Sequence, residues 1–373
     1  MKKYKVCVYA ICKNEEQFVE RWFNSMKEAD EIYVLDTGST DNTVKKLKQC
    51  GVHVKTKTIN PWRFEVARNL SLDMVPTDCD ICVCTDLDEI LSSGWRNELE
   101  SVWQQDTTRC RYIYNWKLDD NDKPLVSFYY EKIHSRKNFK WIFPVHEILE
   151  YSGNNEKYVT TDKITLNHYP DPTKSRSSYL KLLELSVKEN PENDRNRHYL
   201  GREYMFHGKW NESIDTLISH LKLPTSTWKD ERAASMRFIA RCYQHLNRTE
   251  EARMWLKLAI KEAPYLRDAY VELAKLEYIQ QNWNLVSRYG KKALKIKINE
   301  RSYINEPFTF DETIYDLLSI SSFYLGKYNE ALNYTKKALK INPENTRIQN
   351  NKILIENLLT QKKENNNQGD NNE

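Results

Sequence analysis

The chain has 373 residues, of which 40% are hydrophobic and 29% are charged, and 57 Lys and Arg against 53 Asp and Glu leave a net charge of only +4. This length suits two domains better than one. A charge so close to balance argues against nucleic acid or an anionic membrane as a partner, and no stretch approaches the length of a membrane span.

The first residues resemble a signal peptide only faintly. Two lysines precede a short apolar run, which Lys13-Asn14-Glu15-Glu16 interrupts without a small-residue cleavage site. We therefore predict that residues 5–11 form the first strand and that the protein is cytoplasmic. In a reducing compartment its eight cysteines would mostly be small buried residues, and Cys79-x-x-Cys82 lacks the second ligand pair of a zinc site.

Strand and helix patterns alternate from residue 4 to residue 105. We expect strands at 5–11, 31–35, 52–58 and 81–85, and helices at 15–29, from about 41 to 51, at 64–74 and at 95–103. This alternation predicts an α/β domain with a mostly parallel sheet. Antiparallel strands at 109–116, 124–133 and 140–145 would complete the domain, which we end at residue 172, where two prolines mark a boundary.

From residue 173 the chain reads as helical and repetitive. Small residues, bulky residues and a proline or its equivalent recur about every 34 residues, in a pattern that resembles the tetratricopeptide repeat. We predict an all-α superhelix of such repeats over 173–361, closed by a terminal helix at 345–359, with an irregular helical bundle as the alternative. The Asn-, Gln- and acid-rich residues 362–373 are expected to be a disordered tail.

Two aspartates one residue apart, Asp86 and Asp88, directly follow the apolar run at 81–85. In open α/β sheets ligands bind outside the carboxyl ends of the strands. Hard carboxylate ligands at that position suit Mg²⁺ or Mn²⁺, usually with substrate phosphates. On spacing alone, a metal site and a solvated acidic turn both remain open.

Companion motifs follow the other strands. Residues 10–16 follow the first strand and 34–43 the second, Trp62, Phe64 and 67–69 open the third helix, and 85–89 follow the fourth strand. In this order and spacing they resemble the inverting glycosyltransferases of family 2, which have the GT-A fold, over residues 4 to about 170. The fusion to tetratricopeptide repeats resembles the sublancin-type peptide S-glycosyltransferases.

This resemblance implies roles for individual residues. Asp36 would accept a hydrogen bond from a uracil N–H, Gly38 would permit a turn close to the ligand, and Arg68 would contact base or diphosphate. Asp88 would ligate Mg²⁺ or Mn²⁺, where the cation stabilises the nucleoside diphosphate leaving group. The full set implied for the nucleotide sugar is Asn14, Glu15, Asp36, Gly38, Arg68 and Asp86.

An inverting displacement needs a base for the acceptor proton, usually a carboxylate. Glu147 is the first candidate because it follows a strand in the part expected to face the acceptor, and Glu89 is a rival. His146 would complete the metal shell with Asp86 and Asp88, or touch the diphosphate. His168 could line the site or be structural.

The sequence thus predicts an inverting, metal-dependent glycosyltransferase that moves a hexose or N-acetylhexosamine from a nucleotide sugar, with UDP favoured, to a peptide or protein side chain. In the alternative, the acceptor is a cell-surface glycan or lipid-linked saccharide and the repeats dock a partner. A third reading is a scaffold with a decayed transferase, and the intact Asp36, Arg68, Asp86 and Asp88 argue against it. A homodimer through the repeats follows from the resemblance alone.

Overall fold

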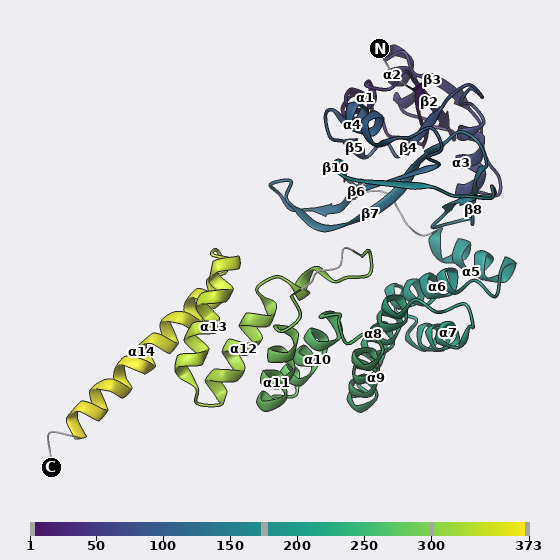
Figure 1. Ribbon diagram of the computed structural model, residues 1–373. Helices are drawn as coiled ribbons and strands as arrows, with labels where there is room; N and C mark the ends of the chain where they lie inside the picture. The colour runs from purple at the N-terminus through teal and green to yellow at the C-terminus, as the bar shows by residue number, and fades with distance from the viewer. Residues whose placement is uncertain (1–3, 173–177, 298–301, 370–373) are drawn as a thin grey trace. The chain divides into compact units, whose positions relative to one another are not determined.

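A computed structural model describes residues 4–172, 178–297 and 302–369 of the chain (Figure 1). It contains two compact units, the first of which runs to Pro191, while the second begins at Glu192. The first unit is α/β and the second is helical, so the fold class predicted from the sequence is confirmed. Across the described ranges, no helix is both long enough and apolar enough to cross a membrane.

An eight-stranded sheet in the order β3-β2-β1-β4-β7-β6-β10-β5 forms the centre of the first unit. The first four of these strands are parallel neighbours, whereas β7 runs antiparallel to both β4 and β6. Strand β10 is parallel to β6 and antiparallel to β5. The strands are β1 Val6–Cys12, β2 Glu31–Asp36, β3 His53–Thr56, β4 Ile81–Thr85, β5 Glu89–Leu91, β6 Arg109–Leu118, β7 Pro124–Ser135 and β10 Tyr158–His168.

Strands β1 and β4 are buried along their whole length, because side chains cover both faces of the sheet there. Val6, Val8 and Ala10 enter one hydrophobic cluster, while Cys7 and Tyr9 enter the cluster on the opposite face. Successive side chains of a strand point to opposite faces of the sheet, and here both faces are buried. The sequences of these strands are therefore apolar without interruption.

Five helices belong to this unit. Helix α1 begins at Val19 rather than at residue 15, since residues 16–18 form a turn. Trp22 of α1 is buried, and its indole N–H donates to Thr85 Oγ1 at 3.0 Å, which fixes α1 against the last residue of β4. The helices are α1 Val19–Met26, α2 Thr43–Gln49, α3 Phe64–Leu72, α4 Trp95–Val102 and α5 Tyr179–Glu189.

Two strand features differ from the expectation. The sequence predicts a strand at 140–145, and the structure has β8 at Phe139–Ile142, paired with β9 at Ile148–Tyr151 in a separate two-stranded sheet. Strand β10 and the short strand β5 were not expected. Both lie at one end of the large sheet, where pairing with segments distant in sequence decides the structure.

A chain of buried hydrogen bonds passes through the hydrophobic cluster that contains Cys7 and Tyr9. The Trp141 indole donates to Tyr9 Oη at 2.9 Å, and Tyr9 Oη lies 2.8 Å from His134 Nε2. The other ring nitrogen of His134 lies 2.7 Å from the Ser135 carbonyl oxygen. Burial lowers the pKa of His134 to about 3, so this imidazole is neutral in the folded protein.

This depressed pKa predicts an acid-sensitive fold. As the pH is lowered from about 6.5 to 3, His134 takes up a proton in the unfolded chain but not in the native protein. This residue alone therefore lowers the free energy of unfolding by about 1.4 kcal/mol for each unit that the pH falls. In His134→Gln, urea unfolding of the first unit, followed by tryptophan fluorescence, should show a shallower pH dependence in that range. Equal slopes for the two proteins would contradict the assignment.

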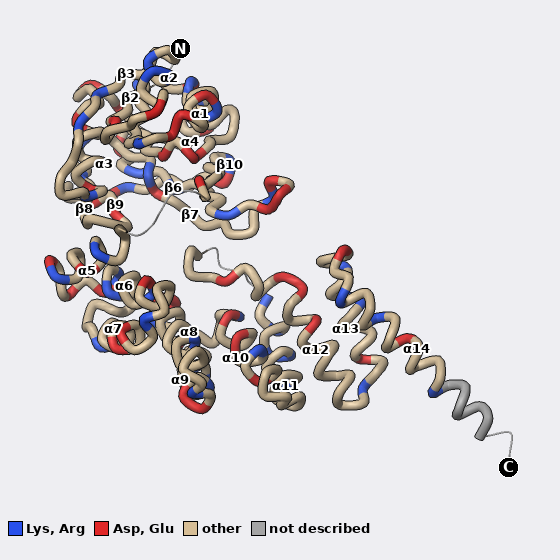
Figure 2. The backbone as a smooth tube through the Cα atoms, turned by 180° about the vertical axis from the view of Figure 1, so that it is seen from behind, with Lys and Arg blue, Asp and Glu red and all other residues tan. Residues whose placement is uncertain are grey.

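Four pairs of helices follow one another in the second unit. Small residues lie where paired helices touch, as expected for tetratricopeptide repeats: Gly201 faces Leu217 of the next helix, and Ala252 and Ala259 are buried. Figure 2 shows basic and acidic residues interspersed along these helices, in keeping with the small net charge. The pairs are α6 Asp194–Phe206 with α7 Trp210–Lys222, α8 Lys229–His245 with α9 Thr249–Glu262, α10 Asp268–Ile279 with α11 Trp283–Ala293, and α12 Thr313–Tyr324 with α13 Tyr328–Ile341.

The short helix η1, Pro307–Thr309, precedes α12, and the terminal helix α14 covers Thr346–Gly369. Helix α14 begins close to the predicted position, with Ile348 and Ile355 buried. It continues beyond residue 361, into the segment for which the sequence predicts a disordered tail. Residues 370–373 of that tail lie outside the described residues.

Gly201 provides a test of the repeat packing. A Cβ on this residue would lie 2.5 Å from Leu217 Cγ and 3.3 Å from Leu217 N, so α6 and α7 would have to move apart. Gly201→Ala should therefore destabilise the second unit by about 1–3 kcal/mol, although Ala is the better helix former. Thermal unfolding by circular dichroism measures this, and in a Leu217→Ala background the same glycine substitution should cost less, because the clashing side chain is gone.

Candidate active site

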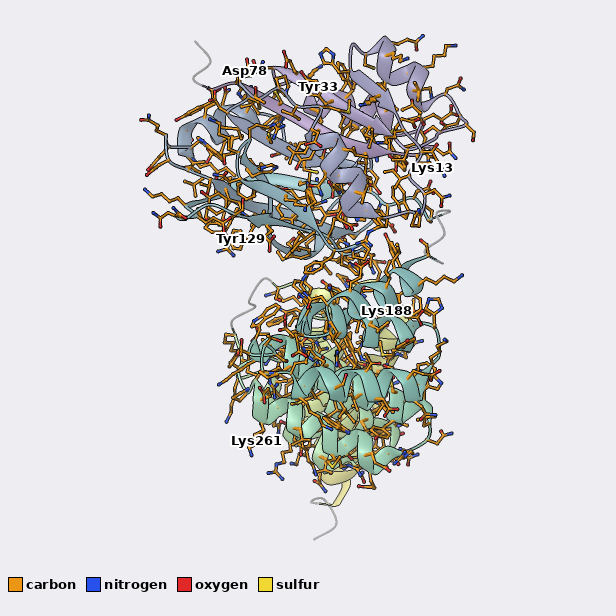
Figure 3. All side chains as sticks on the ribbon, turned by 90° about the vertical axis from the view of Figure 1, so that its right-hand side faces the viewer. Lys13, Tyr33, Asp78, Tyr129, Lys188 and Lys261 are labelled. Atoms are coloured by element: carbon orange, nitrogen blue, oxygen red, sulfur yellow. The ribbon has the colours of Figure 1, made fainter. Side chains whose placement is uncertain are left out.

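The carboxyl ends of β1, β2 and β4 lie side by side. Cys12, the last residue of β1, is paired with Asp36, the last residue of β2, and Ala10 is paired with Thr85 at the end of β4. Figure 3 labels Lys13, just beyond β1, and Asp78, which precedes β4, on opposite sides of the unit. The motifs that follow these strands therefore meet at one edge of the sheet, as their order in the sequence predicts.

Backbone and side-chain hydrogen bonds join the loops after β1 and β2. The Asn14 N–H donates to Ser39 Oγ at 2.8 Å, and Asn14 Oδ1 accepts from the Thr40 N–H at 2.7 Å. Asn14 adopts a left-handed conformation, with φ at 53°, and its side chain is exposed. Glu15 is buried, and its N–H donates to Thr43 Oγ1 at 2.7 Å. Of these two, Asn14 is the one that a ligand can reach directly.

The carboxylate of Asp36 organises the turn after β2. It accepts the N–H of Ser39 at 3.0 Å and that of Gly38 at 3.3 Å, and the residue is only 1% exposed. Gly38 has φ at 109°, a conformation that residues with a side chain rarely adopt. Asp41 accepts the Thr43 N–H at the start of α2, at 3.0 Å. Asp36 thus shapes the turn after β2, and contact between its carboxylate and a base would require this turn to adjust.

A buried ionic chain crosses the centre of the site. Arg68 of α3 is 3% exposed, and its guanidinium contacts Asp86 Oδ1 at 2.8 Å and Glu147 Oε1 at 2.9 Å. Lys132 of β7, also buried, places its Nζ 3.3 Å from Asp86 Oδ2. Both oxygens of Asp86 therefore face protein cations. Burial alone would raise the pKa of Asp86, but Arg68 and Lys132 outweigh it and hold that pKa well below its usual range.

Arg68 was expected to contact base or diphosphate, and this stays a prediction; the structure shows it buried between Asp86 and Glu147. Its planar fork joins two carboxylates from segments that are far apart in the sequence. Burial acts to lower the pKa of Arg68, and the neighbouring charges, Asp86 foremost, raise it well above the ordinary value. The guanidinium is therefore a fixed positive charge beside the turn that carries Asp86.

Glu89 closes the turn that carries the two aspartates. Its carboxylate accepts the Asp86 N–H at 2.8 Å, and its own N–H donates to the Asp86 carbonyl at 3.1 Å. The residue is 1% exposed, and burial together with the charges of Asp86 and Asp88 raises its pKa, against the opposing effect of Lys132. This position disfavours Glu89 as the base, because a bulky acceptor cannot reach it.

The Asp86 side chain is 31% exposed, so both aspartates of this turn are partly accessible. Asp88 is the one that, among the described residues, pairs with a histidine and not with Arg or Lys. Its side chain is 17% exposed, and Oδ2 lies 3.4 Å from His168 Nε2 at the end of β10. Burial lowers the pKa of His168, but the contact with Asp88 outweighs it and leaves that pKa raised. Since Asp86 is already neutralised by Arg68 and Lys132, Asp88 is the residue whose charge and hard oxygen donors fit a divalent cation.

Glu147 and His146 lie in the loop between β8 and β9. The Phe64 N–H at the start of α3 donates to the Pro144 carbonyl at 3.0 Å, which holds this loop beside α3. His146 has φ at 50°, and its ring centre lies 5.9 Å from that of Tyr179.

Asp86, Asp88 and His146 do not form one cluster of metal-binding atoms among the residues that the structure describes. Among the described residues, the one group of three His, Cys, Asp or Glu side chains whose ligand atoms all lie within 4.8 Å is in the second unit and includes none of Asp86, Asp88 and His146. The assignment of these three as metal ligands stays a prediction.

Sequence reasoning missed Lys132 as a site residue. The one signal in the sequence is a lysine inside a predicted strand, between Tyr130 and Ile133. That position does not reveal whether the lysine faces the solvent or the site. Its Nζ lies 4.9 Å from the centre of the Tyr130 ring and 3.9 Å from Glu89 Oε1. The neighbouring carboxylates, Asp86 foremost, raise its pKa well above the ordinary value despite burial, so it carries its charge inside the unit.

Comparison with known proteins agrees with this arrangement. Residues 7–151 match the family described as Glycosyl transferase family 2, and residues 238–265 and 313–345 each match a tetratricopeptide repeat. Uncharacterized glycosyltransferases of Rickettsia bellii and Rickettsia typhi are each 32% identical to the chain over 115 residues, which is 31% of this chain and 38% of theirs. The chain thus spans well under half the length of these relatives.

Solved structures align with a part of the chain. MamA aligns with a TM-score of 0.37 at 20% identity, over 46% of this chain and 91% of that one. The C-terminal part of a TPR repeat-containing protein from Cytophaga hutchinsonii aligns with a TM-score of 0.40 at 13% identity, over 48% and 64%. With the matched residues and the relatives taken together, the chain carries a family 2 glycosyltransferase domain followed by tetratricopeptide repeats.

Proposed function

We propose that the first unit is an inverting, divalent-cation-dependent transferase that moves a hexose or N-acetylhexosamine from a UDP-sugar to a side chain of a peptide or protein. The observation that supports this most is that the two aspartates of the turn after β4 have different ion-pair partners. Asp86 is neutralised by Arg68 and Lys132, while the partly exposed carboxylate of Asp88 pairs with His168. Both lie at the sheet edge outside which open α/β sheets bind their ligands.

The donor would bind along the joined loops after β1 and β2. Asn14 exposes its side chain there, and the turn that Asp36 and Gly38 shape would form one wall of the donor site. Bound Mg²⁺ or Mn²⁺ would supply positive charge to the diphosphate leaving group. Asp88 would hold the cation, with substrate phosphates completing its coordination.

Glu147 is the proposed base. Arg68 donates to its Oε1, which fixes the carboxyl group and leaves Oε2 for the acceptor proton. Glu147 is thereby oriented by a group that cannot itself take the proton, since the guanidinium stays charged. An acceptor thiol would need less help from a base than a hydroxyl, because its pKa is lower.

The repeats support a polypeptide acceptor, because paired-helix repeats of this kind build extended binding surfaces. Exposed aromatic side chains such as Phe206 and Trp228 lie on the second unit. Aromatic side chains of this kind are enriched at protein–protein interfaces.

The full chain should hydrolyse one nucleotide sugar slowly when Mn²⁺ is present and not when EDTA replaces it. UDP-glucose, UDP-N-acetylglucosamine and GDP-mannose are screened by release of the nucleotide. Mass spectrometry of peptides produced in the same cells then identifies an acceptor by the added hexose or N-acetylhexosamine. Turnover unaffected by EDTA would refute the cation, and a glycan that is modified while peptides are not would refute the acceptor.

A further inference from the structure

Three buried residues of the repeat unit bring metal-binding atoms together. His198 in α6, His220 in α7 and Glu231 in α8 come from consecutive helices, and their ligand atoms all lie within 4.8 Å of one another. Both histidines are 0% exposed and Glu231 is 3% exposed. Polar groups this deep in a helical core need partners, because leaving them unsatisfied is costly.

Ser235 orients both imidazoles. Its Oγ lies 2.7 Å from His198 Nδ1 and 3.0 Å from His220 Nδ1. If each Nδ1 carries the proton and donates it to this oxygen, both Nε2 atoms keep their lone pairs. Histidines that bind metals are held in this way, with one ring nitrogen donating to an outer partner and the other facing the ion.

The two Nε2 atoms have different surroundings. His220 Nε2 lies 3.0 Å from Ser226 Oγ and 3.4 Å from Glu231 Oε1. His198 Nε2 is buried and has no hydrogen-bond partner among the described residues. A hydrogen-bonded core network would satisfy this atom, whereas a ligand position has to leave it open.

We propose that His198, His220 and Glu231 bind one divalent transition-metal ion of the zinc type inside the repeat unit. Two imidazoles and a carboxylate are the donor set that Zn²⁺ accepts, and alkaline-earth ions prefer oxygen ligands alone. The site is independent of the transferase unit and would join α6, α7 and α8.

The test uses the full chain, stripped of metal with a chelator and titrated with Co²⁺ and then Zn²⁺. We expect one equivalent of Co²⁺ to give the visible absorption of a tetrahedral nitrogen and oxygen site, Zn²⁺ to displace it, and one Zn²⁺ to raise the unfolding temperature. His198→Gln should abolish the Co²⁺ spectrum. Ser235→Ala keeps all three ligands and should weaken binding about 10–100-fold.

His245→Gln is the matched control, since it changes an exposed histidine of the same helix as Glu231 and should bind like the wild type. The titration of the wild-type chain tests the proposal even if a variant fails to fold. No Co²⁺ spectrum and no effect of Zn²⁺ on the unfolding temperature of the wild-type chain would overturn the proposal. Binding that survives in a folded His198→Gln would overturn it as well.

Discussion

Asp88→Asn should lower turnover of the nucleotide sugar by roughly 10³-fold, equivalent to about 4 kcal/mol, and leave the protein folded. Asn keeps the shape of the side chain and an oxygen that can accept from His168, which lies 3.4 Å from Asp88. What it loses is the negative charge that we assign to cation binding. The free energy of unfolding should change by about 0.5 kcal/mol or less, because Asp88 is outside the buried ionic chain.

Nucleotide release and Mn²⁺ titration measure the effect. The wild type should gain activity with Mn²⁺ until the site is saturated, and the residual activity of Asp88→Asn should not respond. Asp78→Asn is the control, since Asp78 is a highly exposed carboxylate at the opposite edge of the sheet. Normal Mn²⁺-dependent turnover in Asp88→Asn would remove Asp88 from the cation site.

Local pattern was enough to predict the parallel half of the sheet. The residues of β1 are buried on both faces and read as one apolar run, and helical spacing identifies α1. Strand β10 differs, because exposed Thr, Asp and Lys side chains interrupt its apolar residues. Its partners β6 and β5 lie far away in the sequence, so long-range pairing and not local pattern determines it.

The same distinction applies to the candidate site. Parallel strands bring their carboxyl ends to one edge, so the meeting of the loops after β1, β2 and β4 could be predicted from motif order. Lys132 comes from β7, an antiparallel strand inserted beside β4, and nothing local reveals which residue of β7 comes to face Asp86. A single sequence likewise does not reveal that Arg68 is buried between the carboxylates of Asp86 and Glu147.

The buried chain Asp86–Arg68–Glu147 gives the second large effect. Arg68→Met removes a guanidinium that contacts both carboxylates and leaves Glu147, 11% exposed, without this partner. Breaking a buried ion pair from one side costs about 3–5 kcal/mol, because an uncompensated charge stays inside. Urea unfolding of the first unit, followed by tryptophan fluorescence, should show this loss at neutral pH.

Two further variants distinguish a buried charge from a general loss of packing. Arg63→Met removes a partly exposed arginine that pairs with Glu65 and Glu189, and it should cost about 1 kcal/mol or less. Adding Glu147→Gln to Arg68→Met removes the negative charge that Glu147 keeps after it has lost Arg68. The double variant should therefore be more stable than Arg68→Met alone. A double variant that is less stable would show that Glu147 keeps a compensating contact without Arg68. The ionic chain would then be less important to the fold than the distances of 2.8 and 2.9 Å imply.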